Sequence, residues 1–302
     1  MTFFRGLIRL IRLIRLIRLI RLIRLIRRLD RSDRSDPSDI HQKNLPPMPI
    51  EYIRYALVGL IIFFAGVAQS AVGFGYALFA TPLLLWLGLP LQNVVTMVAT
   101  CSMLQASIGA FKLRASVPWQ HVRTTTIIRV LFMAIGLFVL KRLAGLHIAQ
   151  IRLVIGVILC LLVALQLLCR PRPAVSLAWY WGAIANVGSG LLAGICGMGG
   201  PPLVLWAMAH DWPSKKMRGF LFGAFAAASP AQLLFLSLSF GPAILWHAAL
   251  GCALLPLVYL GSLVGMPIGN RLNGQRLRWL AYALLAAIGI SAIVPALLGS
   301  GK

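Results

Sequence analysis

Two glycine-rich stretches interrupt apolar segments that otherwise have the composition of membrane helices. The first is centred on GFG at 73–75, and the second runs from Gly194 to Pro202 as GICGMGGPP. Non-helical backbone at membrane depth is tolerated only where protein shields it or where it lines a watery cavity. Unpaired N–H groups at the start of a following helix attract anions. We therefore expect the glycines of both breaks to contact an anion: Gly73, Gly75, Gly197, Gly199 and Gly200.

The residues around the second break divide into two groups. Pro201 and Pro202 lack the N–H group that stays unpaired in a first helical turn, so they suit the start of a new helix. Upstream, Gly188, Gly190 and Gly194 have the spacing of small residues that lets membrane helices pack closely. We assign these three glycines to helix packing.

Polar side chains near both breaks are candidates for contact with an oxyanion. Gln69 and Ser70 precede the first break, with a helix–helix hydrogen bond as the alternative role. After the short segment that follows each break, a serine and a glutamine recur three residues apart, which places both on one helical face. Their hydroxyl and amide groups can donate hydrogen bonds to an oxyanion. These pairs are Ser102 with Gln105 and Ser229 with Gln232.

Two arginines are further candidates, Arg218 just before an apolar segment and Arg129 about one and a half turns inside a predicted helix. Arg218 can pair bidentately with a sulfonate or carboxylate, the alternatives being extension toward the membrane surface or pairing with Asp211. Arg129 is a second candidate, with extension toward the surface as its alternative. Cys196 has no neighbour that would activate its thiol, and His210 is expected at the membrane interface rather than as a proton carrier.

The composition is that of an integral membrane protein. The chain has 302 residues, is 60% hydrophobic and has a mean hydropathy of +0.87. From Met48 onward the only acidic residues are Glu51 and Asp211, so an anionic substrate is expected rather than a cation. The alternative is that basic loops only set orientation. No catalytic triad, metal cluster or phosphate loop is visible, which predicts a protein that is not an enzyme and has no metal and no cofactor.

Residues 1–47 form a basic, low-complexity extension. Leu7 to Arg27 consists of seven LIR copies, in which the arginines wind around a helix and leave no apolar face. Seven arginines exclude a membrane span, although the segment could lie on an anionic lipid surface. Without interleaved aromatic residues, nucleic-acid binding is not expected. We predict a disordered or surface-lying segment without a role in transport.

The rest of the chain divides into two similar membrane repeats, at 48–172 and 173–302. Gly73 and Gly75 align with Gly197 and Gly199 at an offset of 124 residues. Each half predicts a long helix, a short re-entrant or half-crossing helix, and three further helices. The fold class is therefore all-α, with about eight transmembrane helices and two short ones. The predicted helices are 52–70, 74–88, 92–111, 124–141, 148–169, 177–196, 200–210, 216–238, 246–268 and 277–298.

GFGYALFATPLL in the first half, with GICGMGGPPLVLW and WPSKKMRG in the second, resembles the sulfite exporter TauE/SafE family. The resemblance covers about residues 52–298. It implies a two-repeat permease of roughly eight helices for small sulfur-containing anions or organic acids. Arg218 is similar to an arginine often found at that place in the family. The first half departs from the pattern at Tyr76, where a third glycine often stands.

Together these features predict a multi-pass permease of the inner (plasma) membrane that moves a small anion by alternating access. The expected partners are that anion and the lipid bilayer, with a homo-oligomer as an open alternative and no nucleic acid. A membrane-embedded scaffold and, third, a membrane enzyme are the rival interpretations. Counts of Lys and Arg in the loops leave open the side of the N-terminus and whether the repeats are parallel or inverted.

Overall fold

The computed structural model describes residues 49–168 and 177–271, which contain helices and no β-strand. The basic extension at 1–47, with its LIR copies, and the predicted helix 277–298 lie outside these residues. Residues up to Val58 belong to one compact unit, and residues from Gly59 onward belong to another. The packing described below concerns the second unit alone. The helices are α2 Pro49–Val72, α3 Tyr76–Trp86, α4 Leu91–Lys112, η1 Arg114–Ser116, α5 Trp119–Leu143, α6 Ile148–Leu168, α7 Trp179–Cys196, α8 Gly200–Met208, α9 Ser214–Phe240, η2 Pro242–Ile244, α10 Leu245–Ala253 and α11 Leu255–Arg271.

Several of the described helices have the length and hydropathy of membrane spans. Three are long and apolar enough to cross a bilayer, Tyr52–Val72, Leu91–Lys112 and Ser214–Phe240. A fourth crossing is possible if the bent pair Pro242–Ala253 and Leu255–Asn270 forms one span. The all-α membrane class is therefore confirmed, and the count of eight spans stays a prediction.

The predicted continuous helix 246–268 is wrong. The structure has two helices here, α10 and α11, which meet at Leu254 with a bend of 46°. Pro256 explains the break, because its ring lacks an N–H donor and clashes with the carbonyl of Cys252 one turn earlier. The apolar run continues across this point, so hydrophobicity alone does not reveal the bend.

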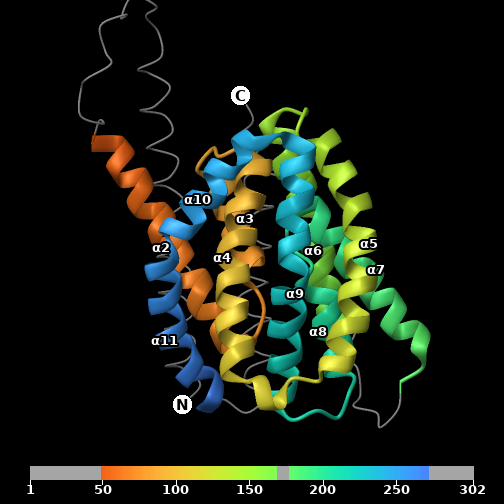
Figure 1. The fold of residues 1–302 in the computed structure, drawn as a ribbon. Helices are drawn as coiled ribbons and strands as arrows, with labels where there is room; N and C mark the ends of the chain where they lie inside the picture. The colour runs from red at the N-terminus through yellow and green to blue at the C-terminus, as the bar shows by residue number, and fades with distance from the viewer. Residues whose placement is uncertain (1–48, 169–176, 272–302) are drawn as a thin grey trace, which may run out of the picture. The chain divides into compact units, whose positions relative to one another are not determined.

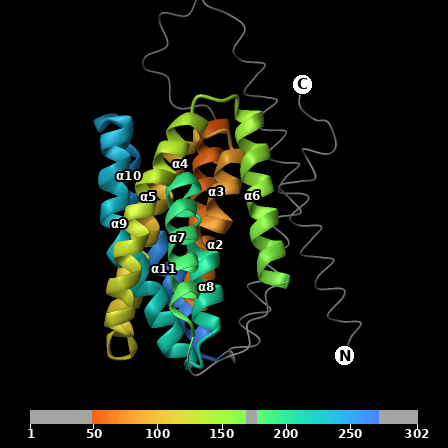
Figure 2. The same ribbon diagram turned by 90° about the vertical axis from the view of Figure 1, so that its right-hand side faces the viewer.

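Helices α4 and α9 pack against each other and run in opposite directions (Figure 1). Helix α5 packs on α9 and α7, and α10 packs on α4. The view turned by 90° shows α7 and α8 together beside α5 (Figure 2). The short helices α3 and α8 lead into opposite ends of the bundle, because α4 begins at one end and α9 begins at the other (Figure 1).

Glycines bring the backbones of α5 and α7 together. A Cβ atom added at Gly190 would lie 2.5 Å from the Arg129 carbonyl oxygen. One added at Gly194 would collide with the Met133 carbonyl oxygen, and one at Gly136 with that of Leu191. Packing roles for Gly190 and Gly194 are thus confirmed.

Gly188 lacks such a close neighbour, because its added Cβ would lie 3.6 Å from Pro202, an ordinary contact. The packing role predicted for Gly188 is therefore wrong, and α7 has two glycines that are needed for close packing and one that has room for a methyl group.

Glycines of α11 bring its backbone close to that of α2 in the same way. An added Cβ at Gly261 would lie 2.7 Å from the Phe63 carbonyl oxygen. Those at Gly265 and Gly269 would collide with the carbonyl oxygens of Val67 and Ala71. Three glycines at intervals of one helical turn thus form a continuous contact with α2.

Gly194→Ala is expected to destabilise the protein by about 1–3 kcal/mol, because the added methyl group overpacks the contact with α5. Gly188→Ala is the matched control on the same helix, and its stability should equal or exceed that of the parent. Thermal unfolding in detergent measures both. Equal transition temperatures for the two variants would show that the α5–α7 contact is looser than described.

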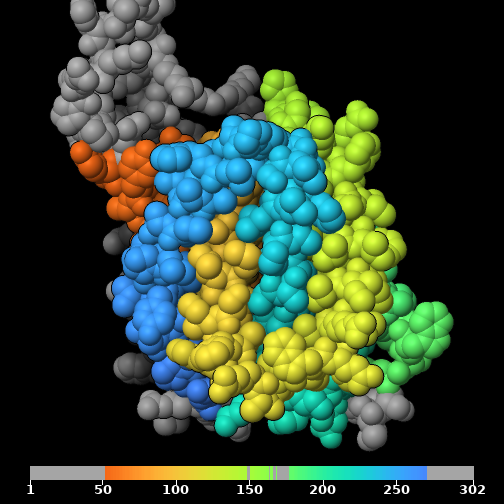
Figure 3. Space-filling view, viewed as in Figure 1, coloured from red at the N-terminus to blue at the C-terminus, as the bar shows by residue number. Residues whose placement is uncertain are grey.

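The outer surface of the described helices is apolar. In the space-filling view, α11, α4, α9 and α5 form a continuous face (Figure 3). Large side chains are exposed on these elements and on α10, with exposed fractions of 61% for Phe138, 73% for Leu238 and 67% for Trp246. Exposure on this scale is unfavourable in water and suits contact with lipid.

Candidate anion-binding site

The two helix breaks are equal in length, and they lie at the two glycine motifs, 124 residues apart. Helix α2 ends at Val72 and α3 begins at Tyr76, while α7 ends at Cys196 and α8 begins at Gly200. Each break therefore spans three residues. Gly73, Gly75 and Gly197 have φ angles of 93°, 102° and 75°, a region that favours glycine.

Gly199 is required for a different reason. Its φ angle of −71° suits any residue, but an added Cβ would lie 2.5 Å from the Ser189 carbonyl oxygen. The same Cβ would lie 3.1 Å from Arg129 Nη2. The Ser189 hydroxyl also donates a 2.6 Å hydrogen bond to the Gly199 carbonyl oxygen. Gly199 thus lets the second break lie against α7 and the Arg129 guanidinium.

The two breaks meet each other. An added Cβ at Gly200 would lie 3.4 Å from the Phe74 side chain, and one at Gly197 would lie 3.9 Å from Ala77 Cβ. Within the described residues, the backbone N–H groups of Gly75 and Gly199 have no hydrogen-bond acceptor. Unpaired donors from both halves of the chain are therefore gathered in one region.

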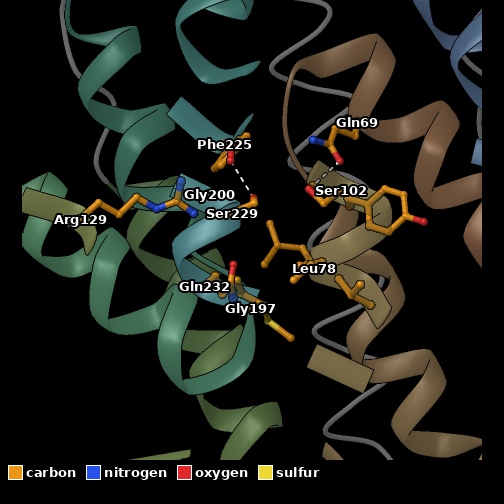
Figure 4. A pocket seen from close by; sticks show the side chains of 15 residues that line it. Gln69, Leu78, Ser102, Arg129, Gly197, Gly200, Phe225, Ser229 and Gln232 are labelled. Atoms are coloured by element: carbon orange, nitrogen blue, oxygen red, sulfur yellow. Dashed lines mark hydrogen bonds between the residues drawn. The ribbon is translucent and has the colours of Figure 1, made fainter. Parts of the chain in front are cut away.

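A pocket lies where the breaks meet (Figure 4). Its empty space of about 440 Å³ includes open solvent, and the cavity within it is narrow, about 30 Å³. Arg129, Ser229 and Gln232 lie on one side, opposite Gln69, Ser102 and Leu78. Among the residues predicted for binding, those that line it are Gln69, Gly75, Ser102, Gly197, Gly200, Ser229 and Gln232.

The polar side chains of this pocket are partly engaged with the protein. Ser102 Oγ donates to Gln69 Oε1 at 3.2 Å, and Ser229 Oγ donates to the Phe225 carbonyl oxygen at 2.7 Å. Gln232 Nε2 donates to the Ala193 carbonyl oxygen at 2.8 Å. The Gln69 amide nitrogen has no acceptor among the described residues, so its two N–H groups can donate to a ligand.

Arg129 places a buried positive charge at the pocket. Its side chain is 4% exposed, and Nη1 donates a 3.2 Å hydrogen bond to the Ala224 carbonyl oxygen. The guanidinium lies over the Phe225 ring at 4.9 Å, and Nε has no acceptor. Arg129 forms no ion pair with any described residue. Its predicted alternative, extension toward the membrane surface, is therefore wrong.

Five predicted residues do not line this pocket: Ser70, Gly73, Gln105, Gly199 and Arg218. Gln105 Nε2 instead donates to the Gly66 carbonyl oxygen, to Ser70 Oγ and to Ser262 Oγ, which joins α4 to α2 and α11. The helix–helix hydrogen bond given as an alternative for Gln69 and Ser70 is thus observed for both, because Ser70 accepts from Gln105 and Gln69 accepts from Ser102.

Arg218 is buried but lies behind the first break. Nη1 donates to Asn270 Oδ1 at 2.8 Å, and Nη2 donates to the Ser70 carbonyl oxygen at 2.6 Å. Its side chain is 1% exposed, and a Cβ added at Gly73 would lie 3.3 Å from its Cγ. Both predicted alternatives, pairing with Asp211 and extension toward the surface, are therefore wrong.

Two residues with possible proton or sulfur chemistry make contacts within the protein, and the interfacial position of His210 stays a prediction. The Cys196 side chain is fully buried, and its thiol donates to the Leu192 carbonyl oxygen at 3.3 Å. His210 Nδ1 lies 2.9 Å from the Trp206 carbonyl oxygen, and its ring stacks on Trp212 with centroids 4.4 Å apart. Neither residue lines the pocket.

Several lining residues escaped the sequence analysis because they are apolar or follow the break directly. Phe225 precedes Ser229 by one helical turn, and Val98 and Ala99 precede Ser102 by about the same distance, so the faces of α9 and α4 already assigned to the pocket could have identified them. No pattern marked the others, which are Tyr76, Ala77, Leu78 and Met198.

Comparison with known proteins identifies the family of the chain. Residues 58–292 match the family described as Sulfite exporter TauE/SafE. The chain is also 24% identical over 254 residues to the probable sulfite/organosulfonate exporter TauE of Cupriavidus necator, covering 80% of this chain and 93% of that protein. No solved structure matches. Both matches are to exporters, in agreement with the prediction that the chain is not an enzyme. The match extends over most of the chain and includes both breaks, so this protein belongs to the sulfite exporter TauE/SafE family.

Proposed function

We propose that this protein is a plasma-membrane permease that moves a small anion by alternating access, with the anion bound where the two helix breaks meet. The substrate is sulfite, a sulfonate or another small sulfur-containing or organic acid. The observation that carries the proposal is Arg129, a buried guanidinium that forms no ion pair with any described residue and lines the pocket.

An anion would supply the partner that the guanidinium lacks. Burying an uncompensated charge costs several kcal/mol, and an opposite charge with hydrogen bonds offsets that cost. From Met48 onward the sequence contains only Glu51 and Asp211 as carboxylates, so few protein groups could neutralise it. A bound oxyanion therefore accounts for a basic residue at this depth.

The remaining donors suit an oxyanion with several acceptor atoms. Arg129 Nε, the Gln69 amide and the backbone N–H group of Gly75 lack acceptors among the described residues. These donors belong to the first half, while Ser229 and Gln232 of the second half line the same pocket, so one small ligand would contact both halves. The name of the relative in Cupriavidus necator supports sulfite or an organosulfonate as the ligand.

The proposed architecture is two inverted repeats, at 48–172 and 173–302, with about eight spans and two half-crossing helices. Equal breaks at an offset of 124 residues and the antiparallel pair α4 and α9 support it. Gln105 donates to the Gly66 carbonyl oxygen and Gln232 to that of Ala193, both at an offset of 127 residues. In transporters of this design, rocking of one part against the other opens a midplane site to each side in turn. Residues 1–47 have no part in this movement.

Transport by purified protein in lipid vesicles tests the proposal. Vesicles loaded with radiolabelled sulfite, taurine or acetate are expected to show saturable flux for at least one anion, reduced by the unlabelled competitor. Vesicles without protein are the control. Properly folded protein that moves none of the three would contradict the proposal and favour a scaffold without a transported substrate.

A further inference from the structure

A second pocket lies at the end of the bundle where α9 begins. It is formed by the α4–α5 connection, the first turn of α9 and the end of α11, and its empty space of about 1370 Å³ includes open solvent. The basic residues lining it are Lys215, Lys216 and Arg218, and no acidic residue lines it. The full lining is Ala115, Ser116, Val117, Pro118, Pro213, Ser214, Lys215, Lys216, Arg218, Gly269 and Asn270.

Arg218 gives this pocket a deeply buried cation. Its side chain is 1% exposed, Nε has no acceptor, and the residue forms no ion pair with any described residue. Lys215 is exposed and Lys216 is half-buried, with its Nζ 5.1 Å from the Trp212 ring centroid. Positive charge therefore extends from solvent to the base of the pocket.

The backbone adds to this preference for anions. Helix α9 begins after Pro213, and no side chain caps its N-terminus. The first N–H groups of a helix have no partner within it and carry partial positive charge. The buried Arg218 independently indicates that this pocket binds a ligand and not solvent alone.

Arg218 also connects this pocket to the first break. Nη2 binds the Ser70 carbonyl oxygen, and the side chain packs against Gly73. Two residues further along, Gly75 lines the central pocket. The first break therefore has Arg218 on one side and the central pocket on the other.

We propose that the pocket formed by Lys215, Lys216 and Arg218 is a second anion-binding site, from which a small oxyanion passes to the central pocket. The binding is independent of the proposed transport, whereas the passage depends on it. Lys215 and Lys216 attract the anion from solvent, and Arg218 receives it. Release of Arg218 from Ser70 and Asn270 then opens the way past the first break.

Chemical labelling of Ser214→Cys tests binding without any transport measurement. Two thiosulfonates are compared, the anionic sulfonatoethyl reagent and the neutral methyl reagent. The labelling of native cysteines is measured on the parent protein and subtracted. Positive potential at the pocket is expected to favour the anionic reagent. Lys215→Gln with Lys216→Gln should lower that preference about tenfold. Methanesulfonate, which is unreactive toward thiols, should slow labelling of Ser214→Cys when Lys215 and Lys216 are present. It should not slow labelling when both lysines are replaced by glutamine.

Lys141→Gln with Arg142→Gln is the matched control, because it removes two charges from the opposite end of α5. It should leave the preference and the protection unchanged. In vesicles, the lysine double variant should raise the half-saturation concentration about tenfold for anion added on the side where α9 begins, with the maximal rate unchanged.

The outcomes separate the two proposals. Protection by methanesulfonate without flux of any anion would retain this binding site and reject the transport function. Flux with no preference for the anionic reagent and no protection would overturn the second site while leaving the permease intact. A lysine double variant that keeps the parent half-saturation concentration on both sides would overturn the passage through this pocket.

Discussion

Arg129→Met is expected to reduce anion flux by about one to two orders of magnitude at concentrations below half-saturation, while the protein stays as stable as the parent or becomes more stable. A charge-assisted hydrogen bond to the anion is worth about 1.5–3 kcal/mol, which corresponds to this loss. Methionine fills a similar volume and removes a charge that no described residue neutralises. Replacing buried charges by apolar groups is often neutral or stabilising by about 1–4 kcal/mol.

Flux in vesicles and thermal unfolding in detergent, measured on the same preparation, check this result. Arg142→Met, an exposed arginine on the same helix that lies over Phe138, should change neither quantity. A variant at Arg129 that keeps parental flux would remove the main support for an anion in the pocket. Loss of stability together with loss of flux would instead assign Arg129 to the fold.

Gly199→Ala is expected to abolish most of the flux and to destabilise the protein by about 1–3 kcal/mol. The backbone conformation of Gly199 allows alanine, so the effect arises from space alone. The new methyl group would lie 2.5 Å from the Ser189 carbonyl oxygen, 2.9 Å from Ala193 Cβ and 3.1 Å from Arg129 Nη2. The break must then move away from α7, which displaces both its N–H donor and the guanidinium.

Gly75→Ala is the informative comparison in the other break. No atom lies within 4 Å of the added Cβ, but the φ angle of 102° strains any residue with a side chain, at a cost of about 1–2 kcal/mol. Stability should therefore fall in both variants for different reasons, and Gly75→Ala should retain more flux. Parental flux and stability in Gly199→Ala would show that the second break is not tightly packed.

The helix breaks were predictable because their signals are local. Glycine permits positive φ angles and proline fixes φ, each at its own position. The predicted end of a helix at Cys196 and the predicted start at Gly200 therefore match α7 and α8. The bend between α10 and α11 was missed although it has a local cause in Pro256. The apolar run across it resembled a single span, and proline within membrane helices is common enough not to force a break.

The side chains of the site were harder to predict because their roles depend on the rotation of each helix. Arg129 and Arg218 lie in or beside apolar segments, and the sequence favoured Arg218 on family resemblance. In the structure Arg129 lines the central pocket, whereas Arg218 lies behind the first break. Likewise, Gln232 lines the pocket but Gln105 does not, although both donate to a neighbouring backbone carbonyl.

The glycine contacts between α5 and α7 and between α11 and α2 have a consequence for assembly. Each contact joins the third long segment of one half of the chain, with α10 and α11 counted as one segment, to the first helix of the other half. The first half therefore cannot complete the glycine contacts of α2 and α5 during synthesis until the second half has emerged. In the proposed alternating-access cycle, a rigid body that moves must combine helices from both halves, so its boundary does not coincide with the midpoint of the polypeptide.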